Sequence, residues 1–116
     1  MNPTPDTTPQ VTVTETMVTP TGLDPINDTY ETQSFGVFVR WQGGLGWTVT
    51  RMNTEHRLSV KGRKWAWHVP RRNRRFYYFP DYDTALQAAI DAVDDVIVNG
   101  GTWTWAQWQK HIKENP

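Results

Sequence analysis

The stretch from residue 64 to residue 98 constrains the fold of this chain more than any other part of its sequence. Its first segment, KWAWHV, alternates as a strand does, with Trp65 and Trp67 on one face, and it ends before Pro70. After the basic run RRNRR, an aromatic segment, FYYF, ends before Pro80. Proline cannot donate a hydrogen bond to a strand ladder, so each segment must stop there. The stretch predicts two strands joined by a basic turn.

The residues that follow have the pattern of an amphipathic helix. Thr84 and Gln87 have the spacing of a capping box, and Asp81 and Asp83 place negative charge where a helix begins. The Asn-Gly pair at 99–100 has the composition of a helix end. Apolar residues at helical spacing predict the buried face. They are Leu86, Ala89, Ile90, Val93 and Ile97.

A second, shorter helix is expected near the C-terminus. Thr104 and Gln107 again have capping-box spacing, and Trp103 and Trp108 occupy the two positions of a hydrophobic staple. We expect this helix to pack its tryptophans on the first helix or on the edge of the sheet.

Upstream of residue 64 the sequence has the alternation of a β-hairpin. The segments SFGVFVRW and WTVTRM flank QGGLG, whose glycines supply the positive φ angles of a tight turn. In the second strand Trp47, Val49 and Arg51 share one face. The run RLSVK predicts a further short strand with Leu58 and Val60 pointing inward.

Strands followed by helices predict an α+β fold class in a single small domain over residues 34–116. The expected architecture is an antiparallel three- to five-stranded sheet packed on one face by a long C-terminal helix plus a short second helix. The other face would be open to water or to a partner.

Residues 1–33 are rich in threonine and proline and poor in apolar periodicity. A segment of this composition buries too little apolar surface to offset the entropy of ordering it, so we expect a disordered acidic tail. The alternative is that VTVTETMV, at 11–18, alternates at period two and adds an edge strand.

Charge is distributed very unevenly along the chain, although its formal net charge is zero. Residues 1–35 carry five acids and no base, whereas residues 36–80 carry ten bases and one acid, a net of +9. Residues 81–116 carry six acids and two lysines, a net of −4. A central basic block between acidic flanks is typical of a protein that binds a polyanion.

Several functional classes find no support in the sequence. There is no cysteine, which excludes disulfides, thiolate zinc sites and cysteine nucleophiles and fits a cytoplasmic location. No apolar run approaches the roughly 20 residues of a membrane span. His56, His68 and His111 are not at metal-ligand spacing. Without a catalytic constellation we expect no enzyme, no cofactor and no metal.

The run from residue 64 to residue 92 resembles the APETALA2 and ethylene-response-factor type of DNA-binding domain, and the arm-binding domains of some phage integrases. The resemblance implies a three-stranded sheet packed on one helix, whose open face lies in the DNA major groove. Tyr77 and Tyr78 stand where that family has Leu-Gly. The matching residues are Lys64, Trp65, Val69, Arg71, Arg72, Arg74, Arg75, Phe79, Asp83, Thr84, Ala88, Ala89 and Asp91.

We therefore expect a small non-enzymatic module that binds nucleic acid, DNA more than RNA, through the open sheet face and the arginine hairpin. Lysine and arginine neutralise phosphates, and planar side chains stack on bases. The expected phosphate contacts are Arg63, Lys64, Arg71, Arg72, Arg74 and Arg75. The expected base contacts are Arg40, Arg51, Trp65 and His68.

Two other interpretations remain open at this point. The basic residues can protect a sheet edge, or pair with the acidic N-terminal segment or with Asp81 and Asp83. Alternatively the chain is a protein-interaction module, such as a phage-encoded regulator that binds a host protein, because exposed tryptophan and arginine are enriched at protein interfaces.

Overall fold

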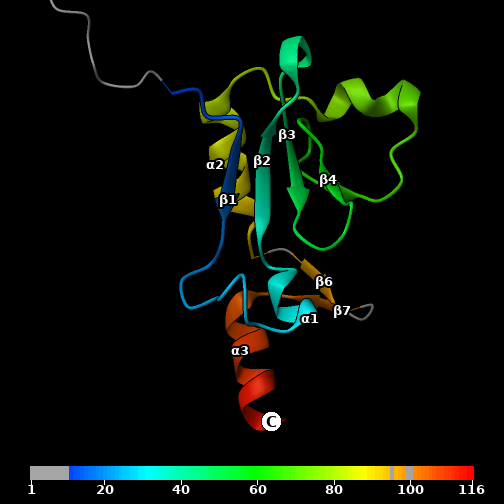
Figure 1. The fold of residues 1–116 in the computed structure, drawn as a ribbon. Coiled ribbons are helices and arrows are strands. Elements are labelled where there is room, and N and C mark those ends of the chain that lie inside the picture. The colour runs from blue at the N-terminus through cyan, green and yellow to red at the C-terminus, as the bar shows by residue number, and fades with distance from the viewer. Residues whose placement is uncertain (1–10, 95, 99–100) are drawn as a thin grey trace, which may run out of the picture.

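Within the described residues, five strands form one antiparallel sheet, and the chain runs through them in sequence order (Figure 1). The computed structural model describes residues 11–94, 96–98 and 101–116. The helix α2, Tyr82–Ala92, covers one face of this sheet. The predicted α+β class with an antiparallel sheet is thereby confirmed. The strands are β1 (Glu15–Val18), β2 (Val37–Trp41), β3 (Trp47–Arg51), β4 (Arg57–Leu58) and β5 (Trp65–Ala66).

The hairpin of β2 and β3 is the centre of the sheet and forms as predicted. Val39 pairs with Val49, and the chain turns through a short 3-10 helix, η1 (Gly43–Leu45). Because successive side chains in a strand alternate between faces, the pairing puts Val37, Val39 and Val49 under α2, where all three are fully buried. This apolar layer holds α2 on the sheet.

The first strand contradicts part of the expected disordered tail. β1 pairs along its length with β2, from Glu15 with Arg40 to Val18 with Val37. The second half of the alternating segment, residues 15–18, thus adds an edge strand, because each ordered residue gains ladder hydrogen bonds. The hydroxyl groups of Thr16 and Tyr82 are also 2.8 Å apart, which ties β1 to α2. The part of the predicted tail over residues 1–10 lies outside the described residues.

The buried face of α2 differs from the predicted one. It consists of Ala85, Ala88, Ala89 and Ala92, whereas Ile90 is 47% exposed. Small side chains let the helix approach closely, so the bulk of the core comes from the sheet and from Phe79. The helix begins one turn earlier than the capping-box spacing predicted, with Asp81 as its N-cap.

The predicted second strand of the basic hairpin does not form. After β5 the chain enters a 3-10 helix, η2 (Arg71–Tyr77), which takes up most of the basic and aromatic segments. Pro70 precedes it with φ −57°, and its carbonyl accepts a 2.8 Å hydrogen bond from the Asn73 amide. Phe79 alone joins the sheet, exchanging backbone hydrogen bonds of 2.9 and 2.7 Å with Trp47.

A second hydrophobic core lies below the sheet and includes the C-terminal elements of the chain (Figure 1). Strand β6 (Val96–Val98) stands where the predicted helix would continue, and it pairs with β7 (Gly101–Trp103). The predicted helix end at 99–100 lies outside the described residues. The short helix α1 (Tyr30–Gln33) and the terminal helix α3 (Trp105–Glu114) complete this core. Its buried members are Leu23, Phe35, Val96, Val98 and Trp108.

The terminal helix has the predicted start but another packing partner. Thr104 and Gln107 form both hydrogen bonds of the capping box, and the rings of Trp103 and Trp108 lie 5.4 Å apart. The tryptophans pack on Phe35 rather than on α2 or the sheet edge: the Trp105 ring meets Phe35 edge-on at 5.2 Å. The Trp108 indole donates a 2.9 Å hydrogen bond to the Thr32 hydroxyl.

Candidate nucleic-acid interface

A groove of about 650 Å³ opens on the sheet face that α2 does not cover. Strands β2 to β4 supply its floor. The β3–β4 loop, residues 52–55, forms one wall, and the β5–η2 connection together with Arg74 of η2 forms the other. The side chains that line it are mostly polar. They include Arg40, Thr50, Asn53, Thr54, Arg57, His68 and Arg74.

The register of the sheet places a cation on the floor of this groove. Phe38 pairs with Thr50, Thr50 with Arg57, and Arg57 with Ala66, so these side chains share the uncovered face. Arg57 belongs to β4, a strand of two residues, and is half-buried. Arg57 therefore lines the groove from β4, the fourth strand of the sheet.

The loop wall is tied to the second core. The Tyr30 hydroxyl donates a short hydrogen bond to the carbonyl of Asn53, and the Asn53 amide nitrogen donates one of 2.8 Å to the Tyr30 carbonyl. Asn53 therefore links the groove wall to α1. Two reciprocal hydrogen bonds of this kind restrict the loop and hold the groove open.

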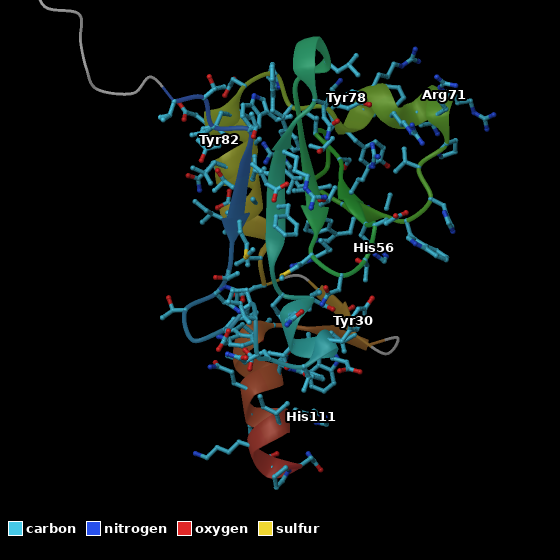
Figure 2. All side chains as sticks on the ribbon, in the orientation of Figure 1. Tyr30, His56, Arg71, Tyr78, Tyr82 and His111 are labelled. Carbon is cyan, nitrogen blue, oxygen red and sulfur yellow. The ribbon has the colours of Figure 1, made fainter. Side chains whose placement is uncertain are left out.

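The opposite wall depends on an unusual backbone conformation. His68 has φ 55°, in the left-handed region that histidine adopts more readily than most residues. This residue lies two positions after the end of β5, and Pro70 then precedes η2. The reversal carries η2 away from the sheet, and Figure 2 shows Arg71 at its outer end. Arg74, one turn further, lines the groove.

Eight basic side chains between residues 57 and 75 form what we call the basic arm. Among the residues that the structure describes, no acid pairs with any of them: the ion pairs present are Arg40 with Glu15 at 2.8 Å and Lys110 with Glu114 at 3.9 Å. Over residues 11–33, the alternative in which acids of the N-terminal segment pair with the basic residues is therefore seen at Arg40 and not in the basic arm. The basic arm consists of Arg57, Lys61, Arg63, Lys64, Arg71, Arg72, Arg74 and Arg75.

The acids at the start of α2 do not pair with the basic arm either, within the same described part of the chain. Asp81 instead accepts a 2.8 Å hydrogen bond from the backbone amide of Thr84. The backbone and side chain of Thr84 hold the pKa of the Asp81 carboxyl below its usual 3.8. This carboxylate therefore serves the helix N-terminus.

Two predicted base contacts, Arg51 and Trp65, have side chains packed toward the covered side of the sheet. Arg51 is only 4% exposed and donates hydrogen bonds to the carbonyls of Ala92 and Val93, at the end of α2. Trp65 packs against the main core with the Arg51 guanidinium 4.4 Å from its ring. Both side chains are therefore engaged in holding the fold together, although Arg51 also borders the groove.

The two remaining predicted base contacts line the groove, and the charge of one of these two is balanced by an acid. Arg40 lies on the groove but pairs with Glu15 and stacks 4.2 Å over the Phe38 ring. His68 lines the groove. Arg63, Lys64 and the four arginines of η2 are exposed.

Trp67, which was not among the expected base contacts, is 61% exposed. The strand alternation placed it beside Trp65 on one face, but β5 ends at Ala66 and the alternation ends with it. Its ring lies 3.8 Å from that of His68, and the His56 ring lies 6.4 Å away and nearly parallel, at 22°. An exposed indole thus stands next to a residue that lines the groove.

His56 is the titratable neighbour of this indole. Burial, and then the positive charge of Arg51, lower the pKa of the His56 imidazole from its ordinary 6.5. Its Nδ1 is 2.7 Å from the Thr54 hydroxyl in the loop wall. The ring is therefore neutral at pH 7 and held in place.

A second groove, of about 510 Å³, lies on the other side of η2. Val60, Phe76 and Tyr78 give it a largely apolar lining, with Lys61 and Arg75 at its edge. Phe76 is 51% exposed, and the Arg75 guanidinium lies 4.8 Å from its ring. This groove was not predicted either, because the aromatic segment was expected to be a strand.

In the described ranges, no group of three or more histidine or acidic side chains could hold a metal ion. Over the same ranges no helix has the length and apolar character needed to cross a membrane. Comparisons with protein-family models, with curated proteins and with solved structures found no significant match for this chain.

Proposed function

We propose that this chain binds nucleic acid through the basic arm and the groove beside it. The observation that carries the proposal is that eight cationic side chains lie between residues 57 and 75 and that no carboxylate of the described chain pairs with them. Unpaired lysines and arginines attract phosphates and release condensed counterions when they bind them. A cluster of this size exceeds what solubility requires.

The arrangement of the cations supports a backbone-tracking mode of binding. Arg57 and Arg74 both line the groove, whereas Arg71 and Arg72 lie earlier on η2 and outside its lining. A phosphate backbone that enters along η2 would meet the outer arginines first and the groove arginines next. Arginine suits this role because its planar fork binds phosphate oxygens in pairs.

DNA is favoured over RNA because the run 64–92 resembles DNA-binding domains. The docking geometry of that family does not transfer, since residues 71–77 form a 3-10 helix where the family has a turn and a strand. The proposal therefore rests on the charges and on the groove.

Fluorescence anisotropy with labelled DNA across a salt series tests the proposal. Reversing two charges in Arg72→Glu/Arg74→Glu should weaken binding at least tenfold and reduce the slope of log K against log salt by about two. Lys110→Glu/Lys113→Glu makes the same change in net charge on α3, at the other end of the molecule, and should change little. Equal losses in both double variants would contradict a localised site.

The apolar groove favours a second candidate function, binding of a protein partner. Phe76 and Tyr78 with Val60 offer an aromatic and aliphatic surface of the kind found at the centre of protein interfaces. If the protein shows no salt-sensitive binding to any form of nucleic acid, binding of a protein partner at the apolar groove becomes the better proposal.

A further inference from the structure

The most exposed tryptophan of the described chain is the one beside the polar groove. Trp67 is 61% exposed, although its neighbour Trp65 packs on the core. A large indole left in water gains nothing for folding, whereas a flat aromatic face next to cationic side chains suits a nucleobase.

We propose that the groove takes a single strand of nucleic acid, with an unpaired base stacked on Trp67 and the adjoining phosphates bound by Arg57 and Arg74. This inference rests on the proposed nucleic-acid function and names the form of the ligand. It uses residues from three separate segments, β4, the β5–η2 connection and η2.

The surroundings of Trp67 hold its ring in a restricted position. The His68 ring lies 3.8 Å from the indole because the left-handed backbone at His68 folds the two side chains together. The His56 ring stands nearly parallel at 6.4 Å and is fixed by its contact with Thr54. A platform that is ordered before binding loses less entropy when a base stacks on it.

The groove supplies the rest of a nucleotide site. His68 and Arg74 line the wall next to Trp67, and Arg57 lies on the floor. Asn53 adds an amide side chain to the lining of the same groove, whereas the Thr50 hydroxyl oxygen is buried. One stacked base with a phosphate on either side therefore meets complementary chemistry at each part.

A duplex does not fit this arrangement. Bases within a duplex are stacked on each other, so their faces are covered and Trp67 could stack only on a base that has left the helix. The groove has two walls and a volume of about 650 Å³. This is the size of a small-molecule pocket, which suits a few unpaired nucleotides.

The far side of η2 offers a continuation of the same path. Arg74 lines the polar groove, and the next two residues, Arg75 and Phe76, line the apolar groove. Phe76 is also an exposed aromatic ring, and the Arg75 guanidinium lies close to it. A strand that crosses η2 would find a second stacking position there.

The test compares a labelled single strand of fifteen thymidines with a mixed-sequence duplex of equal length, by anisotropy at several salt concentrations. We expect the single strand to bind at least tenfold more tightly. Trp67→Ala should weaken single-strand binding by about ten- to a hundredfold, the usual effect of removing one stacking ring. It should leave the salt slope unchanged, because no phosphate contact is lost. Trp67→Phe should retain most of the affinity.

Trp41→Ala is the matched control. Trp41 is also exposed, at 49%, but it lies at the end of β2 outside the groove, so its removal should not affect binding. Circular dichroism and melting curves establish that each variant is folded.

Two results would overturn the inference alone: duplex bound as tightly as single strand, or Trp67→Ala equal to the unaltered chain. Either would leave salt-dependent binding, and hence the proposed function, in place. If neither form of DNA nor a single strand of fifteen uridines binds, the proposed function itself is wrong and the inference is wrong with it.

Discussion

The guanidinium of Arg51 donates a 2.9 Å hydrogen bond to the carbonyl of Ala92, the last residue of α2. A second bond, of 3.1 Å, reaches the Val93 carbonyl. The last carbonyls of a helix have no partner within it, and a cation beside them also complements the helix dipole. One side chain of β3 thus closes the helix that covers the sheet and ties the two layers together.

Replacing Arg51 should therefore affect stability rather than binding. Arg51→Met keeps much of the apolar length but leaves buried carbonyls without a donor, and we expect a loss of about 2–3 kcal/mol in the free energy of unfolding. Urea denaturation measures it. Arg40→Met is the control: Arg40 is an exposed partner of Glu15, so its loss should cost less than about 1 kcal/mol. Equal costs in both variants would contradict the capping role.

Gly46 should be far less replaceable than Gly44. A Cβ at Gly46 would lie 2.3 Å from the Phe79 carbonyl oxygen, and φ is 111°. Gly46→Ala therefore has to break the exchange of hydrogen bonds between Trp47 and Phe79, at a cost of roughly 2 kcal/mol or more. A Cβ at Gly44 would meet nothing within 4 Å, so Gly44→Ala should change stability by less than about 0.5 kcal/mol. Thermal melts of the two variants check the contrast, which would fail if both melted alike.

The parts of the fold that depend on near neighbours in sequence were predictable. Strand alternation identified the β2–β3 hairpin, and it also placed Arg51 on the face of Val49, which is the covered face. That alternation already conflicted with a role for Arg51 in binding. The capping box at Thr104 is local and forms as predicted.

The features that were missed depend on contacts between distant segments. β1 is stable only because β2 pairs with it across the sheet. The aromatic segment has strand propensity, but Pro70 starts η2, and only Phe79 finds a strand partner, in Trp47. Trp67 is exposed beside the groove because β5 stops after Ala66, which no local pattern marks.

The choice of buried face on α2 shows the same limit and gives a direct test. Periodicity placed both Ala89 and Ile90 on the buried face, whereas close approach to the sheet buries Ala89 fully and leaves Ile90 47% exposed. Ala89→Leu should overpack the interface and cost about 1–3 kcal/mol. Ile90→Ala should cost less than about 1 kcal/mol, since its side chain is half in water. Chemical denaturation measures the loss of stability in each variant. A larger loss for Ile90→Ala than for Ala89→Leu would mean that Ile90 belongs to the buried face, as predicted.

Stability should fall as the pH drops below about 6.5, and His56 should cause a defined part of the loss. Burial and the charge of Arg51 lower the pKa of the folded-state imidazole below 6.5, its ordinary value. Between the two pKa values the unfolded chain binds the proton and the folded chain does not, so protons favour unfolding there. Above pH 6.5 both states are neutral at this site and no penalty remains. Urea denaturation at pH 7.5 and at pH 5.5 measures the decline.

His56→Gln isolates this contribution because glutamine does not titrate, while His68 and His111 remain in both proteins. We expect the variant to lose less free energy of unfolding than the unaltered chain when the pH falls from 7.5 to 5.5. Its stability at pH 7.5 serves as the baseline, since only the difference between the two pH values reports the titration. An identical decline in both proteins would mean that the His56 imidazole gains its proton as readily in the folded state as in the unfolded chain.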